Sequence, residues 1–400
     1  MKQAEARPFI KTTTFLYTIS LVLLFLKTFY WKFFWTIPEQ VFLILSLCTG
    51  ILYFLNHKMY FSNRKKVIFL LLIIFYAIHV MSNAGQGLFG IFLTILNVVL
   101  ILEINQDDMI LAFITIKIVF TIICLISLAG WIVVNLLHIG LPMHYSQYGI
   151  YQFYDYGIFN MRVEGISFSR YLGMFLEPGY TGVMCVLLVC CDRFDLRKVD
   201  NIILIVCALF TLSLAAYLLI ALFWILYKPS LRKAFSIVIT ILGVALILAL
   251  VSNYVPELKR TLDYFVIDRL DSMLSGNIFG NRFSNSFNNF FNKNILKDPW
   301  NFFFGIGSVK LATYSLSAAG FKVFWAQDGL FNLIIILVVN YIFCMGIEEN
   351  DHRWNNYVLF FIWLFSFIDI AYPTWVCFQI LMICGPTNYR NASVLTMNGE

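Results

Sequence analysis

Charged residues stand at the start of an apolar segment in SRYLGMFLEPGYTGVMCVLLVCC, residues 169–191, where Arg170 and Glu177 precede a Pro-Gly pair. If this segment is a membrane-spanning helix of about 20 residues, it begins near Leu172, and Glu177 then lies roughly 7–8 Å inside its outer end. A carboxylate at that depth is costly unless it faces protein or a wet cavity, which favours a functional role. The alternative is a short helix that begins at Pro178, with Glu177 at its N-terminus and stabilised by the helix dipole.

Four arginines accompany this stretch in two polar segments: Arg162, Arg170, Arg269 and Arg282. The guanidinium group is always charged, and its fork of donors matches a phosphate, so arginines gathered at a membrane face are suited to hold a lipid diphosphate. Any one of them taken alone is explained as well by contact with lipid headgroups. The four together favour a ligand.

The remaining polar candidates have simpler structural explanations. Asp328 opens an apolar segment after Trp-Ala-Gln and is suited to stabilise a helix N-terminus, while His79 lies inside an apolar segment as a satisfied polar contact. His138 and His144 flank a Gly-Leu-Pro turn, and Asp369 sits late in an apolar segment. The sequence contains no phosphate-binding loop, zinc pattern, serine-hydrolase elbow or dinucleotide glycine motif.

The composition defines the elements that must position these residues. Hydrophobic residues make up 60% and charged residues 12% of the 400 residues, and the mean hydropathy is +0.81, which excludes an ordinary soluble protein. The nine cysteines lie in or beside apolar runs and predict neither a disulfide framework nor a zinc site. The N-terminal cations precede an apolar run without a small-residue cleavage site, which favours a retained first helix. Nucleic-acid binding has no support beyond weak basicity.

The apolar segments predict an all-α polytopic membrane protein with about 12 transmembrane helices in a single integral membrane domain, residues 1–400. Cations on both flanks place both ends of 201–227 inside, so we interpret it as a hairpin turning near Thr211-Leu212-Ser213. One long tilted helix is the alternative, and it would reverse the predicted side of the membrane for every loop after residue 227. The expected segments are 13–31, 38–55, 66–82, 87–104, 109–137, 172–191, 201–227 (two passes), 234–252, 328–347, 355–372 and 374–385.

This topology leaves two long segments outside, 138–171 and 253–327. In the second, apolar residues recur at helical spacing over 258–273 and 283–295, which predicts two amphipathic helices lying on the outer membrane face. The sequence DPWNFFFGIGS, residues 298–308, follows and carries the Pro and Gly of a sharp turn.

Two local patterns resemble bacterial O-antigen polymerases, the Wzy-type polysaccharide polymerases that are related to O-antigen ligases. The first is R-x-x-G-x-F-x-E-P-G, and the second is an Arg and a Gly separated by ten residues; a later Arg and a G-x-G complete the resemblance. Here the residues are Arg170, Gly173, Phe175, Glu177, Pro178 and Gly179, then Arg162 with Gly173, then Arg282 with Gly305-Ile306-Gly307. The architectural resemblance, which is GT-C-like, covers nearly the whole chain.

The resemblance implies glycosyl transfer between lipid carriers at the periplasmic face of a bacterial inner membrane. An undecaprenyl-diphosphate-linked oligosaccharide would be the donor and another would be the acceptor, with no metal or other cofactor and with a chain-length regulator as a protein partner. The implied catalytic residues are Arg170, Glu177 and Arg282, and the implied substrate-binding residues are Arg162, Gly173, Arg269, Gly305, Gly307 and Asp328. Glu177 would orient or deprotonate the acceptor hydroxyl, or only position Arg170, and Arg269 competes with Arg282 for the role in the second loop.

Two other functions stay open. O-antigen ligases carry a His near the outer start of the segment after the second long loop, where this chain reads WAQDGLFNL, and 253–327 contains no His. A flippase for lipid-linked sugars would also place cations in a membrane cavity, but such transporters usually show repeated halves, and this sequence has no internal repeat. A purely structural protein would leave the arginine-rich loops and Glu177 unexplained.

Overall fold

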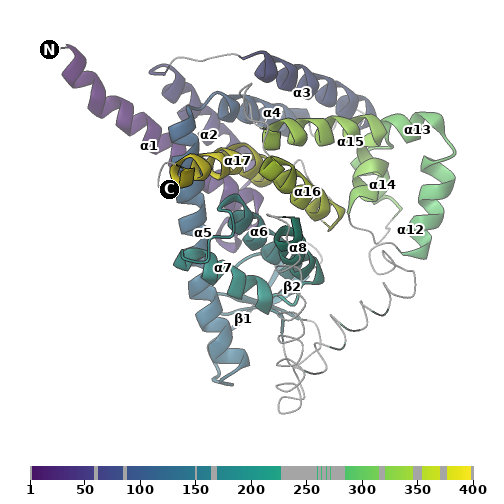
Figure 1. Ribbon diagram of the computed structural model, residues 1–400. Helices are drawn as coiled ribbons and strands as arrows, with labels where there is room; N and C mark the ends of the chain where they lie inside the picture. The colour runs from purple at the N-terminus through teal and green to yellow at the C-terminus, as the bar shows by residue number, and fades with distance from the viewer. Residues whose placement is uncertain are drawn as a thin grey trace. The chain divides into compact units, whose positions relative to one another are not determined.

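The computed structural model is mostly helical (Figure 1). It describes residues 2–57, 62–83, 88–148, 151–163, 169–226, 284–314, 320–345, 354–369 and 376–397, with residues 259, 263, 267 and 271. The predicted segment 234–252, Arg269 and Arg282 lie outside the described residues, as does the first predicted amphipathic helix, 258–273, except for those four residues. Two compact units make up the chain: Met1–Lys117 with Arg282–Glu400, and Ile118–Asn281.

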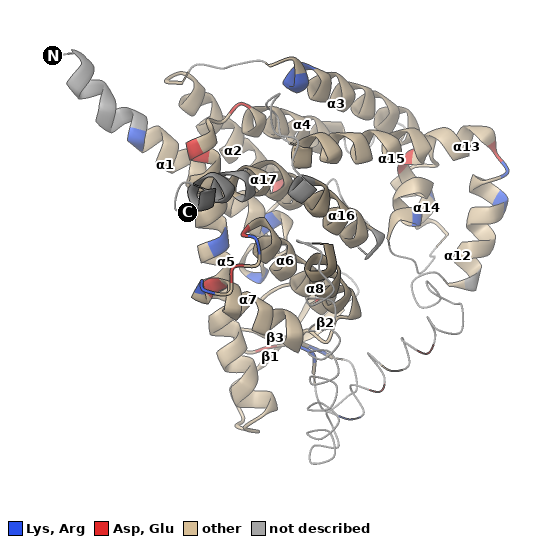
Figure 2. Ribbon diagram, in the orientation of Figure 1, with Lys and Arg blue, Asp and Glu red and all other residues tan. Residues whose placement is uncertain are grey.

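Three helices in the described part of the chain are long and apolar enough to cross a membrane. They are α3 (Asn63–Ser82), α5 (Gln106–Asn135) and α15 (Phe321–Met345), and shorter apolar helices accompany them. The charged residues of α3 lie at its start, as Figure 2 shows, because its sequence begins Asn-Arg-Lys-Lys and continues apolar. A helical membrane protein therefore agrees with the structure at this level of detail.

The first unit packs helices from the two ends of the chain against one another. Helix α1 (Lys2–Thr28) packs on α2 (Glu39–Phe54), α2 on α4 (Leu88–Leu102), and α15 on both α3 and α16 (Trp354–Asp369), while α17 (Val376–Met397) contacts α1, α4 and α15. At the charged end of α3, Lys65 pairs with Glu103 beyond the end of α4, at 3.3 Å. The start of α3 and the end of α4 therefore lie at the same end of this helix pair.

The second unit confirms the helical hairpin predicted within 201–227. Helix α7 (Val199–Phe210) and helix α8 (Leu214–Leu226) are joined at Thr211–Ser213, where Leu212 adopts a positive φ of 47°. Both helices pack on α6 (Pro178–Cys191). At Gly182 of α6 the hairpin approaches closely, since a Cβ there would lie 2.6 Å from the Thr211 hydroxyl.

The all-α prediction missed a small sheet in the segment 138–171. Strands β1 (His144–Tyr148), β2 (Tyr151–Asp155) and β3 (Asn160–Arg162) form an antiparallel sheet in that order. Tyr151 pairs with Tyr148, and Arg162 pairs with Phe153. Phe153 is fully buried, so this sheet packs against the protein through an apolar side chain, whereas the sequence predicted only a polar outer loop here.

The prediction for 172–191 was wrong about where the helix starts. Helix α6 begins at Pro178, and the preceding residues 172–176 are buried but not helical. Pro178 has no amide hydrogen to continue a helix upstream, and its fixed φ suits the first helical position. Glu177 is therefore the N-cap residue, in extended conformation with φ −141°, and not a residue one turn inside the helix.

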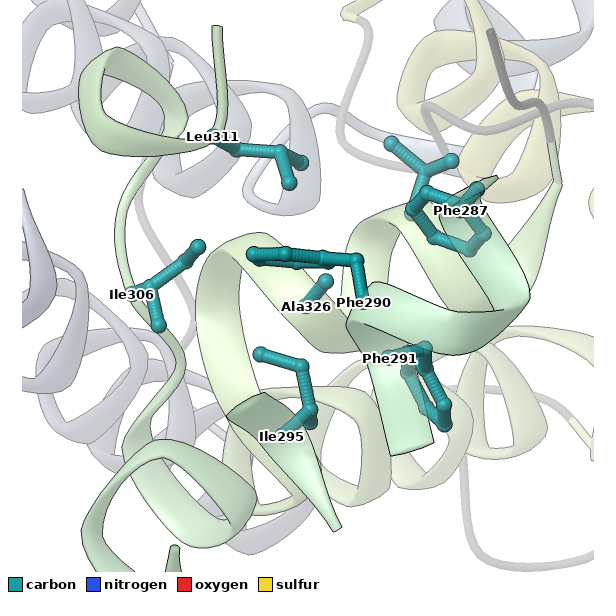
Figure 3. Packing of buried hydrophobic residues seen from close by; sticks show 8 residues of the cluster. Phe287, Phe290, Phe291, Ile295, Ile306, Leu311 and Ala326 are labelled. Atoms are coloured by element: carbon teal, nitrogen blue, oxygen red, sulfur yellow. The ribbon is translucent and has the colours of Figure 1, made fainter. Parts of the chain in front are cut away.

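The second predicted amphipathic helix exists, but its apolar face packs within the protein and not on a membrane surface. Helix α12 (Asn285–Phe290) continues into a π-helical turn, Phe291–Ile295, and is followed by α13 (Pro299–Phe304) and α14 (Ser308–Ala312). Figure 3 shows the apolar side chains of residues 287–295 packed into one interior with residues of α14 and α15. The cluster comprises Phe287, Phe290, Phe291, Ile295, Ile306, Leu311, Val323 and Ala326.

Candidate functional site

An Arg, a Tyr and a Glu meet at the junction between the sheet and α6. The Arg162 guanidinium lies over the Tyr151 ring, 4.5 Å from its centroid, and the Tyr151 hydroxyl donates to Glu177 Oε1 at 2.5 Å. Arg162 Nη1 is 4.0 Å from the same carboxylate oxygen. About 31% of the Arg162 side chain and 23% of the Glu177 side chain stay exposed, so the cluster is held in place and still open to a ligand.

Glu177 is the N-cap residue of α6, but its carboxylate does not cap the helix. An acidic N-cap residue often accepts from the first backbone amides of its helix, yet the Glu177 side chain makes no such bond. Its carboxylate turns instead to Tyr151 and Arg162. Among the two interpretations of the sequence, the short helix with Glu177 at its N-terminus is the correct one.

Arg170 lies in a buried segment beside the same sheet, with 7% of its surface exposed. The preceding residue, Ser169, is fixed by its carbonyl, which accepts from the Trp131 indole at 3.0 Å, and by its hydroxyl, which donates to the Arg162 carbonyl at 3.4 Å. After it, the Tyr171 amide donates to the Phe210 carbonyl at 3.1 Å. Electrostatic interactions of a guanidinium strengthen where water is excluded, so burial strengthens the interactions that Arg170 makes within the protein.

Gly173 closes this segment onto the sheet. Its carbonyl accepts from the Asn160 amide of β3 at 2.8 Å, and its φ of +68° is one that side chains rarely adopt. A Cβ would also lie 3.2 Å from the Tyr171 hydroxyl. Gly173 therefore meets a conformational requirement that holds residues 170–173 against β3, and its part in substrate binding stays a prediction.

The first unit holds Gly305, Gly307 and Asp328 in a separate arrangement. The Ile306 and Gly307 amides donate to the Ala326 and Gln327 carbonyls at 2.9 and 3.0 Å, so residues 305–307 run alongside 326–328. Gly305, Gly307 and Gly329 all have positive φ, and Gly329 kinks α15. A Cβ on any of the three would overlap backbone atoms of a neighbouring segment.

Asp328 is bound to a histidine from a distant helix. His79 Nδ1 lies 2.5 Å from Asp328 Oδ1, and the side chains are 13% and 9% exposed. The expectation that His79 is a satisfied polar contact is thus confirmed. One turn further, the Asn83 side-chain oxygen accepts from both the amide and the hydroxyl of Ser308, at 2.7 and 2.9 Å.

The structure thus brings Arg162, Arg170, Gly173 and Glu177 together in one unit and Gly305, Gly307 and Asp328 together in the other. Tyr151 and His79 were missed as site residues. The alternation in YQFYDYG, residues 151–157, is the signal that could have placed Tyr151 on a strand. Nothing in the sequence pairs His79 with Asp328, because 249 positions separate them.

Among the described residues, no group of three or more His, Cys, Asp or Glu side chains is arranged to hold a metal ion. Comparisons of the chain with models of protein families, with curated proteins and with solved structures give no match. The resemblance to polysaccharide polymerases therefore depends on the sequence motifs alone.

Proposed function

We propose that this protein polymerises undecaprenyl-diphosphate-linked oligosaccharide repeat units into a surface polysaccharide, by glycosyl transfer at the outer face of a bacterial inner membrane. The observation that carries the proposal is the cluster of Arg162, Tyr151 and Glu177 next to the buried Arg170. Ser169, the residue before Arg170, bonds to the Arg162 carbonyl, so both arginines belong to the same folded segment.

The proposed chemistry is electrostatic. The acceptor hydroxyl attacks the anomeric carbon of the donor glycan, and the bond from that carbon to the diphosphate oxygen breaks. The electron pair leaves with the carrier diphosphate, and the hydroxyl proton passes to that diphosphate or to water. Arg162 and Arg170 stabilise the charge that develops on the leaving group. Oxygen atoms of a diphosphate accept bidentate bonds from guanidinium groups, which fixes the reacting end of the donor.

Glu177 acts in this scheme as a positioning residue. Its carboxylate accepts from Tyr151 and lies within ion-pair distance of Arg162, so it orients the arginine that the tyrosine ring supports from one face. A partly exposed ion pair contributes little stability, on the order of 0–1 kcal/mol. Orientation of the guanidinium, and not stability, is what this contact supplies.

Deletion of the gene in its host, followed by gel analysis of the surface polysaccharide, tests the proposal. Collapse of the polysaccharide ladder to one repeat unit per lipid core is the expected result. Long glycan that accumulates on its carrier without attachment would instead identify a ligase, and repeat units retained inside the membrane would identify a flippase. Either result, or an unchanged ladder, would overturn the polymerase proposal.

A further inference from the structure

A cavity of about 480 Å³ lies in the first unit, next to the His79–Asp328 pair. Its volume falls within the range of about 300–1,000 Å³ that is typical of small-molecule sites. The lining residues come from α2, α3, α4 and the start of α14. They are Glu39, Gln40, Leu43, His79, Gly90, Ile91, Thr94, Ser308 and Val309.

The chemistry of this lining favours a neutral, hydroxyl-bearing ligand. Hydroxyl, amide, imidazole and carboxylate groups face the cavity beside three aliphatic side chains, and the lining contains no Lys or Arg. A phosphate would be repelled by Glu39. A sugar ring offers hydroxyl donors to the carboxylate, to the imidazole and to the Thr94 and Ser308 oxygens, and C–H groups to the aliphatic side chains. The Thr94 and Ser308 hydroxyls act as acceptors because they donate their own protons to the Gly90 carbonyl and to the Asn83 side chain.

The His79–Asp328 contact prepares one acceptor for such a ligand. Because a carboxylate oxygen accepts, the 2.5 Å contact assigns a proton to His79 Nδ1, whose other polar neighbour is the Asn83 side-chain nitrogen at 3.3 Å. In the neutral ring the other nitrogen, Nε2, is then an acceptor, and a carboxylate that fixes a histidine ring in this way also fixes its tautomer. Because His79 lines the cavity and Asp328 does not, the Nε2 edge is the one left for a ligand hydroxyl.

The helix ends around the cavity are all predicted to lie on the same side of the membrane. The basic start of α3 is predicted to be cytoplasmic, and His79 lies at the opposite end of that helix. Glu39 opens α2, and Gly90 lies in the first turn of α4. Under the predicted topology these helix ends all face outward, where a lipid-linked glycan would be presented.

We infer that this cavity is a binding subsite for a sugar residue of the lipid-linked glycan, with His79 as its hydrogen-bond acceptor and Asp328 as the residue that orients His79. The inference rests on the proposed polymerase function and deepens it, since it assigns recognition of the sugar to residues outside the arginine cluster. It gives Asp328 a positioning role in place of direct contact with substrate.

Gly90 provides a test that leaves the fold intact. A Cβ at Gly90 meets no atom within 4 Å, so the position opens into free space. Gly90→Phe fills the cavity and is expected to reduce the polysaccharide ladder of a complemented deletion strain about ten-fold or more at equal protein level, the loss expected for about 1.4 kcal/mol of binding. Gly140→Phe is the size-matched control outside the cavity, at an exposed position where a Cβ also meets no atom within 4 Å, and it is expected to keep a normal ladder. A normal ladder with Gly90→Phe would overturn the inference.

His79→Ala and Asp328→Asn give a second, chemical test. With the undecaprenyl-diphosphate-linked repeat unit extracted from the deletion strain as substrate, both variants of the purified protein are expected to raise KM several-fold with a smaller effect on kcat. His57→Ala is the matched control, since His57 stacks on Tyr53 at the other end of α2 and should leave KM unchanged. An unchanged KM in both variants would overturn the subsite, and an inactive wild-type protein would overturn the polymerase proposal itself.

Discussion

At the residue scale, Tyr151 is the side chain that joins the two charged members of the site. Its ring supports Arg162 and its hydroxyl donates to Glu177, so one residue fixes both. Tyr151→Phe keeps the ring and removes the donor. A hydrogen bond to a charged group contributes about 1.5–3 kcal/mol, so we expect transferase activity to fall roughly ten-fold or more, and Tyr151→Ala to lower it further.

Polymerisation by purified protein on lipid-linked repeat units is the measurement for these variants. Tyr145→Phe is the matched control, because Tyr145 lies on the neighbouring strand with 72% of its surface exposed. Equal rates for the Tyr151→Phe and wild-type proteins would show that the hydroxyl does not position Glu177 for catalysis.

Arg170 carries the strongest prediction at this scale. Arg170→Ala is expected to abolish the ladder without loss of protein, and Arg170→Lys to restore little of it, because an ammonium group cannot reproduce a bidentate fork. Arg282→Ala is expected to abolish the ladder as well, from the resemblance alone. Arg197→Ala, at an exposed position in the loop between α6 and α7, should behave as wild type. Normal ladders from both Arg170→Ala and Arg282→Ala would remove the proposed site.

At the scale of elements, glycines determine how closely segments cross. Gly307 has φ +82°, and a Cβ there would overlap the backbone of Ser82 at the end of α3. Gly307→Ala must therefore strain the backbone or separate residues 305–308 from α3, at a cost on the order of 1–3 kcal/mol or more. We expect the melting temperature of the purified protein to fall by several degrees.

Gly90→Ala is the opposite case in the same unit. It sits in α4 with open space around it, and replacing a helical Gly by Ala stabilises a helix by roughly 0.5–1 kcal/mol. We expect the melting temperature to fall for Gly307→Ala and to rise for Gly90→Ala when the two purified variants are compared with wild type. A Gly307→Ala protein that melts no lower than wild type would contradict the close crossing.

At the scale of the whole molecule, the number of membrane passes depends on the hairpin formed by α7 and α8. If the hairpin enters and leaves on one side, residue 230 is cytoplasmic and residue 300 is periplasmic. Reporter tags inserted at these two positions are expected to give opposite compartments. The same compartment for both would refute the twelve-pass topology, whatever the enzymatic activity.

The sequence alone was sufficient for features that depend on local composition and periodicity. It placed helices close to the observed α2, α3, α4 and α5, the turn at Thr211–Ser213, and the apolar face of Phe287, Phe290 and Phe291. It did not foresee the sheet over 144–162, because polar and aromatic residues in short strands carry a weak signal. It also extended α6 too far upstream, since it took hydrophobicity rather than Pro178 as the boundary.

What the sequence by itself determined is the class of molecule: an apolar, helical chain with arginines gathered beside Glu177. Only the tertiary structure decided what those residues contact. Glu177 meets Tyr151 because a sheet returns the chain to the start of α6, and His79 meets Asp328 because α3 and α15 pack together. Such contacts join residues far apart in the chain, and their geometry depends on packing that no local pattern encodes.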